Sequence, residues 1–296
     1  MPCNNLPRLV LLLSGLLAET GLIRCHLPMP QGPVFGKASA EMDRSVLYGR
    51  QGTVTTWHET IGAIVQGGGS LIKRSSDGDR EIQAARREWT TIGELRDLIM
   101  SQNNWHNLES PVQGSLFEYA HNPKYVSVRA NDFPYDLPAG VEHYILWTRV
   151  SAITREAFAP RDGEAVPDHS FNDPSRVEAL IRYVEHFDFY GWYGIHDEDV
   201  ENSFALSSFA HATNPVWHDP ESDHTVTREQ GAAVMKWLGR HVAAAIQPHF
   251  PEDEFQVLFN RSPARWKSVV DPDHFHQELV SGQKVQVAQA RRKLFK

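Results

Sequence analysis

Residues 141–150 read VEHYILWTRV, and the pattern of this stretch says most about the fold. β-Branched and aromatic residues dominate it, which is typical of a strand. Neighbouring side chains of a strand point to opposite faces, so the odd-numbered residues 141–147 share one face and the even-numbered residues 142–148 share the other. We therefore predict a strand that carries His143 on a mostly apolar face.

Working outward, helices are indicated by capping residues and by apolar residues three and four positions apart. Thr91-x-x-Glu94 and Thr227-x-x-Gln230 are capping boxes, and Asp173 is suited to cap a third helix. The predicted helices cover 42–65, 91–104, 116–121, 174–190 and 227–246, and further strands cover 255–259, 267–270 and 274–279. This mixture predicts an α+β fold, a curved and mainly antiparallel sheet backed by helices, with insertions.

The chain is expected to comprise a leader, residues 1–40, and one α+β domain, residues 41–296. Leu9–Leu17 is long enough for the apolar region of a signal peptide and too short to span a bilayer. No small-residue cleavage motif follows it, and the weakly basic start also argues against secretion, so we expect a cytoplasmic protein without a membrane partner. Secretion, with this segment as a signal peptide, is the alternative. Residues 155–226 are rich in charged residues, proline and histidine, and we interpret them as an insertion.

Composition narrows the classes of site. The only cysteines are Cys3 and Cys25, both in the leader, so the domain has neither a disulfide framework nor a cysteine zinc site. The formal net charge is −8, which does not indicate a nucleic-acid partner, although a local basic patch is compatible with it.

The clearest candidate for chemistry is His274-Phe275-His276-Gln277-Glu278. On a strand, His274, His276 and Glu278 share one face, where two imidazoles bind a metal or divide the roles of acid and base. The alternative is a polar face turned to solvent. Two histidines and one carboxylate make an incomplete ligand set, so we predict no metal.

Two further segments are candidates for binding. Asn131–Asp136 packs Asp132 and Asp136 around an aromatic pair and a proline, although a structural turn explains it as well. Asn260, Lys267 and Ser268 precede the histidine pair and are suited to bind a phosphate or a developing oxyanion, although a capped loop with a solvated lysine is the alternative.

These motifs together resemble a fungal family of proteins of unknown function, named after an N-acetylglucosamine-induced protein. The similarity covers about residues 89–150 and 228–280 and rests on four segments: Trp89–Asn103, Asn131–Leu137, His143–Thr148 and the run from Asn260 through Lys267 to His276. The family includes the arginine-containing cyclodipeptide synthases, which join two amino acids from charged tRNAs into a diketopiperazine.

The resemblance implies the partners and roles. The partners would be arginyl-tRNA and a second aminoacyl-tRNA, with no cofactor, because the esters are already activated. One of His143, His274 and His276 would act as base, and Lys267 and Ser268 would bind acyl or phosphate oxygens. Asp132, Asp136 or Glu142 would pair with the guanidinium of arginine, and Trp147 and Asn260 complete the candidate substrate contacts.

Two alternatives stay open. The order of Asn260, Ser268, His274 and His276 also resembles histidine-triad nucleotide hydrolases and transferases, with Glu278 in place of the third histidine. A sugar- or metabolite-responsive binding protein without catalysis would use the same pocket.

Overall fold

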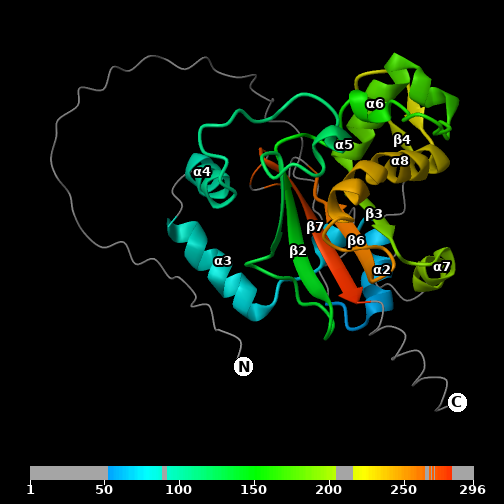
Figure 1. The fold of residues 1–296 in the computed structure, drawn as a ribbon. Coiled ribbons are helices and arrows are strands. Elements are labelled where there is room, and N and C mark those ends of the chain that lie inside the picture. The colour runs from blue at the N-terminus through cyan, green and yellow to red at the C-terminus, as the bar shows by residue number, and fades with distance from the viewer. Residues whose placement is uncertain are drawn as a thin grey trace, which may run out of the picture. The chain divides into compact units, whose positions relative to one another are not determined.

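The computed structural model describes residues 53–88, 92–204, 216–263, 267, 269 and 271–281. The predicted leader, residues 1–40, lies outside the described residues, and so does Ser268. The α+β fold predicted from the sequence is confirmed: an open antiparallel sheet is flanked by helices (Figure 1).

The central sheet has five strands in the order β1-β2-β7-β6-β3, and every neighbouring pair is antiparallel. The strands are β1 (Val126–Ala130), β2 (Glu142–Thr148), β3 (Phe189–Tyr193), β6 (Phe255–Arg261) and β7 (Asp273–Ser281). A second sheet pairs β4 (Trp217–His218) with β5 (Thr225–Val226). The last strand of the described chain therefore lies in the middle of the sheet.

The helices form before, between and after these strands. The α-helices are α2 (Trp57–Val65), α3 (Ser76–Glu88), α4 (Ile92–Gln102), α5 (Leu116–Tyr119), α6 (Pro174–His186), α7 (Asp197–Phe204) and α8 (Arg228–Ile246). Three short 3₁₀ turns are η1 (Gly69–Leu71), η2 (Glu156–Phe158) and η3 (His169–Asn172). Within the described residues, no helix has the length and apolar character needed to cross a membrane.

The predicted caps of α6 and α8 are confirmed. Thr227 Oγ1 accepts the amide of Gln230, and the Gln230 side chain accepts the amide of Thr227, at 3.2 Å each. Asp173 caps α6 through the amide of Ser175, at 2.9 Å. The helix predicted over 174–190 ends at His186, because the following residues extend into β3.

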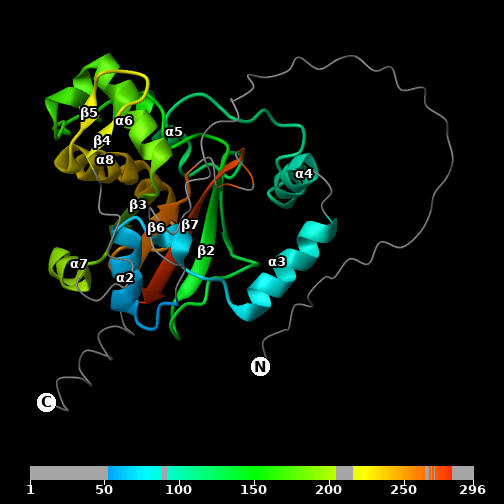
Figure 2. The same cartoon turned by 180° about the vertical axis from the view of Figure 1, so that it is seen from behind.

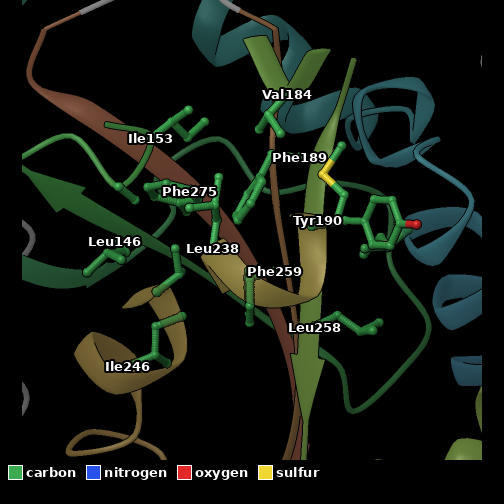
Figure 3. Packing of buried hydrophobic residues seen from close by; sticks show 14 of the residues in the cluster. Leu146, Ile153, Val184, Phe189, Tyr190, Leu238, Ile246, Leu258, Phe259 and Phe275 are labelled. Carbon is green, nitrogen blue, oxygen red and sulfur yellow. The ribbon is translucent and has the colours of Figure 1, made fainter. Parts of the chain in front are cut away.

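One face of the sheet packs on α8 and α6. Leu146, Phe275 and Phe259 are at most 1% exposed and meet side chains such as Leu238 and Ile246 of α8 (Figure 3). Helix α2 lies on the opposite face, as the view from behind shows (Figure 2). The helices α3 and α4 lie toward β2, on the side of the sheet away from β3.

Several elements differ from the sequence prediction. Residues 76–88 form α3, and residues 126–130 form the edge strand β1, although neither was predicted. The strand predicted at 274–279 is confirmed as part of β7, which begins after Pro272. Of the piece predicted at 267–270, Lys267 and Val269 belong to no strand, and residues 268 and 270 lie outside the described residues. Residues 155–226, interpreted as an insertion, contribute β3 to the central sheet and α6 to the layer above it.

Candidate functional site

A cavity of about 170 Å³ lies between the sheet and the helices α3 and α4. Its apolar walls come from Ile82, Leu95, Leu98, Ile99, Phe133, Ile145, Trp147 and Val269. Its polar lining consists of Arg74, Gln102, Arg129, Asn131, Asp132, His274 and His276. A small cavity with apolar walls and a few polar groups is the usual form of a ligand site.

The register of two central strands brings the polar groups together. In the β2–β7 pair, His143 is opposite Glu278, Ile145 opposite His276, and Trp147 opposite His274. Directly opposed residues point to the same face of a sheet, so the odd positions of β2 and the even positions of β7 form one surface. This surface is turned away from α8 and carries the three histidines.

The three histidines lie together. His143 Nε2 is 3.1 Å from His276 Nδ1, and the ring centroids of His274 and His276 are 5.6 Å apart. His274 and His276 line the cavity, whereas the His143 side chain is 2% exposed and is not among the lining residues. His143 therefore supports His276 from below and does not reach a ligand itself.

The loop before β2 holds His143 in place. The backbone amide of Tyr135 donates to His143 Nδ1 at 3.0 Å, and the Tyr135 ring stacks on His143 with centroids 4.5 Å apart. The Asn131 side-chain amide also contacts the His143 ring, and Asn131 Oδ1 accepts the amide of Phe133 at 2.9 Å. The segment 131–136 therefore holds the histidines in position through its contacts with His143.

Burial keeps the imidazoles neutral. It lowers the pKa of His276 to about 3, and the nearby positive charges of Arg74 and Lys267 add to the effect. Burial likewise places the pKa of His143 and of His274 well below the usual range. At neutral pH these side chains therefore offer one N–H donor and one nitrogen acceptor each, and no charge.

Glu278 lies beneath the histidines and not in the cavity wall. It is 0% exposed, and its Oε1 is 3.6 Å from His143 Nε2. Asn260 donates to both Glu278 oxygens at 3.3–3.4 Å, while Asn260 Oδ1 has no partner among the described residues. Burial raises the pKa of Glu278 to about 8, so the group is mostly a neutral acid at pH 7.

The structure separates the predicted substrate contacts. Asp132 and Trp147 line the cavity, and Trp147 packs on His274 with ring centroids 4.8 Å apart. Glu142 is exposed on the other face of β2, because even and odd positions alternate. Asp136 is also exposed and outside the cavity, because its backbone pairs with Lys73 and turns the chain away.

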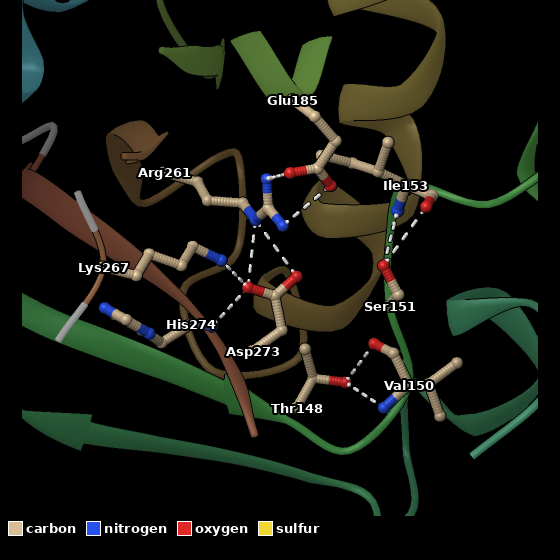
Figure 4. Close-up of polar contacts among 9 residues, drawn as sticks. All are labelled: Thr148, Val150, Ser151, Ile153, Glu185, Arg261, Lys267, Asp273 and His274. Carbon is tan, nitrogen blue, oxygen red and sulfur yellow. Dashed lines mark hydrogen bonds and ion pairs between the residues drawn. The ribbon is translucent and has the colours of Figure 1, made fainter. Parts of the chain in front are cut away.

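Lys267 does not reach the cavity either. Its ammonium binds the Asp273 carboxylate, which also accepts from Arg261 Nε at 2.9 and 3.1 Å (Figure 4). Arg261 in turn binds both Glu185 oxygens of α6, at 3.2 and 3.0 Å. Burial lowers the pKa of Lys267 to about 8, an effect that Asp273 partly offsets. This ion cluster anchors the start of β7, and the Asp273 carboxylate also accepts the His274 amide at 2.8 Å.

Sequence reasoning missed two arginines in the cavity wall, Arg74 and Arg129. Arg74 donates to the Phe133 carbonyl and lies over the Tyr135 ring, 5.5 Å from its centroid. Arg129 lies on β1 and donates to the Gln102 carbonyl of α4 at 3.1 Å. Arg129 is part of a strand that the sequence pattern does not indicate, and Arg74 lies in an isolated bridge before α3. An isolated arginine carries no local signal.

Within the described residues, no group of three or more His, Cys, Asp or Glu side chains has a geometry that would hold a metal ion. The sequence suggested His274, His276 and Glu278 as metal ligands on one face of β7. Glu278 is buried in the protein, where it accepts hydrogen bonds from Asn260.

Comparison with known proteins gives a family for part of the chain. Residues 56–178 match the family described as "Protein of unknown function (DUF3605)", and a domain of this family therefore covers that stretch. The match includes Asn131 and His143 and stops before β7. No curated protein matches the chain. A solved structure titled "Crystal Structure of HTC1" is 18% identical, with a TM-score of 0.37 over 77% of this chain and 85% of that chain.

Proposed function

We propose that the cavity forms an arginine-containing cyclic dipeptide from arginyl-tRNA and a second aminoacyl-tRNA. The observation that carries the proposal is the combination of two neutral imidazoles with a described lining that contains no hydroxyl, thiol or amine. Such a site favours proton transfer and hydrogen bonding over attack by a serine, cysteine or lysine of the protein.

Aminolysis of an activated ester fits these groups. The α-amine of one aminoacyl ester attacks the carbonyl carbon of the other, a C–N bond forms, and the ester C–O bond to the tRNA ribose breaks. The amine proton passes through the imidazole to the leaving ribose oxygen. A second aminolysis, within the dipeptidyl ester, closes the six-membered ring. Orientation of two esters in a water-poor cavity supplies much of the acceleration.

The charges of the lining support specific proposals for the substrate contacts. Asp132 is the acidic residue of the described lining, so it is the candidate partner of the arginine guanidinium. Arg74 and Arg129 suit the phosphates at the acceptor end of a tRNA. The net charge of −8 limits binding elsewhere on the tRNA, so the contact would be confined to that end.

The test is product formation by the purified full chain with arginyl-tRNA and each other charged tRNA, read by mass spectrometry. We expect a diketopiperazine that contains arginine, and a loss of at least about 100-fold in His276→Ala. The matched control is His241→Gln, a buried histidine of α8 that contacts Ser115 and the Ala157 carbonyl, far from the cavity lining. A wild-type protein that yields no such product with any partner amino acid would contradict the proposal.

A second candidate is a non-enzymatic binding site for a small anionic metabolite. The observation that favours it is the pair Arg74 and Arg129 in an otherwise largely apolar lining. If the synthase assay fails, a carboxylated or phosphorylated compound that copurifies with the wild type and is lost in Arg74→Gln would support this function.

A further inference from the structure

The hydrogen bonds around His143 determine which of its nitrogens carries the proton. The backbone amide of Tyr135 donates to Nδ1 at 3.0 Å. Asn131 Nδ2 is 3.3 Å from Nδ1 and 3.2 Å from Nε2, so its contact does not distinguish the two nitrogens. The Tyr135 amide does, because it can donate only to an unprotonated nitrogen, and this places the single proton of neutral His143 on Nε2. The amide cannot turn away, because the Arg74–Tyr135 bridge and the bond from Asp136 N to Lys73 O, at 2.8 Å, hold the backbone on both sides.

The same logic passes to His276. Its Nδ1 is 3.1 Å from His143 Nε2, which carries a proton, so His276 Nδ1 must accept. The remaining proton of neutral His276 is therefore on Nε2. In a His143 imidazolium, Nδ1–H would point at the Tyr135 N–H, and two donors would face each other. The geometry therefore excludes the charged form. The lowered pKa values of His143 and His276 agree with this.

The chain of donors ends in the cavity. His276 lines the cavity, and its Nε2 makes no hydrogen bond to any other described residue. His274 lines the same cavity but is not part of the chain: its Nδ1 is buried and has no partner among the described residues. His276 is thus fixed as a donor, while His274 is free to carry its proton on either nitrogen.

We propose that Tyr135 and His143 fix His276 as an N–H donor to a carbonyl or anionic oxygen of the ligand, and that His274 is the proton acceptor. The protonation pattern does not depend on the proposed synthase function, whereas the identity of the oxygen rests on it. There, His276 donates to the ester carbonyl oxygen, which becomes negative when the amine attacks, and His274 takes the amine proton. His143 is then a positioning residue that never meets the substrate.

Nitrogen NMR tests the pattern directly. Protonated and unprotonated ring nitrogens differ in ¹⁵N shift, so long-range ¹H–¹⁵N spectra of the full chain with labelled histidine at pH 7.5 identify each tautomer. His→Gln variants at positions 143, 241 and 276 assign the signals. His241 is the internal reference, because its Nε2 is 2.8 Å from a carbonyl that can only accept.

We expect Nε2–H for His143 and His276 in the wild type. In His143→Phe, which removes the donor and keeps an aromatic ring, we expect His276 to become a mixture of tautomers. A wild-type His276 that is protonated on Nδ1, or that is already a mixture, would overturn the inference. The wild-type spectrum alone identifies the tautomers of His143 and His276, so the test holds even if His143→Phe does not fold.

Product formation tests the assignment of roles. Glutamine has an amide N–H that can replace a donor but cannot replace a base, so His276→Gln should retain at least about 10-fold more activity than His276→Ala. At His274, glutamine and alanine should be equally inactive. Equal loss in the two His276 variants would contradict the donor role. If the wild type makes no product, the proposed function fails while the NMR result still decides the protonation pattern.

Discussion

Glu278 is the most costly single residue of the site to bury. A carboxyl group that is 0% exposed favours its neutral form, because the Asn260 amide and a backbone hydrogen bond at Glu278 compensate only part of the cost of burial. Its pKa is raised to about 8, so the folded protein holds a proton that the unfolded chain, with an ordinary pKa near 4.5, releases. Between these values the folded state binds more protons, and stability falls as pH rises.

Glu278→Gln should remove this pH dependence. Glutamine keeps an oxygen that accepts from Asn260 but cannot ionise. We expect the free energy of unfolding of the wild type to fall by up to about 1.4 kcal/mol per pH unit between pH 5 and 8, relative to the variant. Urea unfolding across that range measures it, with the exposed Glu118→Gln as control. Parallel curves for wild type and Glu278→Gln would show that Glu278 ionises normally.

The two aspartates of the segment 131–136 should differ in effect. Asp132 lines the cavity and Asp136 does not, although they are four positions apart and chemically identical. We expect Asp132→Asn to lower the selection of arginine about 10-fold, because it removes a charge-assisted bond without changing shape. Asp136→Asn is the matched control and should leave selection unchanged. Competition between charged tRNAs, read as product ratios, measures both.

At the scale of elements, the turn η1 is fitted against β6. A Cβ added to Gly69 would lie 2.5 Å from Asn260 Cγ, so the two elements meet with no space for a methyl group. Asn260 cannot move without losing its bonds to Glu278. The residue therefore has to be glycine because of the neighbouring strand, and not because of its own backbone.

Gly69→Ala should destabilise the protein by about 1–3 kcal/mol, as overpacking does in a close-packed interior. The control is Gly239→Ala in α8, where an added Cβ would meet the Phe259 ring at 3.4 Å, an ordinary contact. There the higher helix propensity of alanine should leave stability equal or raise it by up to about 1 kcal/mol. Urea midpoints that rank the two variants in the opposite order would refute this account of η1.

The sequence predicts an element when the pattern that determines its structure lies within its own residues. Helix α8 and strand β2 have signals inside their own residues: a capping box with an apolar periodicity, and a β-rich run. Strand β1 has five residues and lies at an edge, where its pairing with β2 decides its conformation. Helix α3 is polar along most of its length and is fixed by Ile82 at the cavity, a tertiary contact.

The candidate site was predictable to the same extent. Alternation on β2 and β7 predicts the common face of each strand, and the histidines could be grouped from it. Whether a strand residue lines the cavity or lies below it depends on the sheet order and on the helices above. For this reason the sequence pattern predicts ligand contacts at Asn260 and His143, which lie below the cavity, and does not indicate Arg74 and Arg129, which line it.

For the whole molecule, the ion cluster of Arg261, Asp273, Glu185 and Lys267 joins two central strands to α6. Burial raises the pKa of Asp273, but Arg261 and Lys267 outweigh it and hold that pKa below its usual range. Asp273→Asn should cost about 3–5 kcal/mol, because it leaves two buried cations with less compensation. Glu178→Gln, in the exposed pair with Arg155, should cost less than about 1 kcal/mol. Similar losses for both, in urea unfolding, would mean that the cluster adds little.

The position of β7 has a consequence for how the chain matures. This strand is the last described element in sequence, yet it lies between β2 and β6, and each needs it as a partner. Until residue 281 leaves the ribosome, β2 and β6 each have one edge without a partner strand. More than a hundred residues of sequence separate β2 from β7. Such long-range pairing is slow, and open edges invite association with other chains. The sheet therefore cannot be completed, and His276 cannot come to lie beside His143, until β7 has been synthesised.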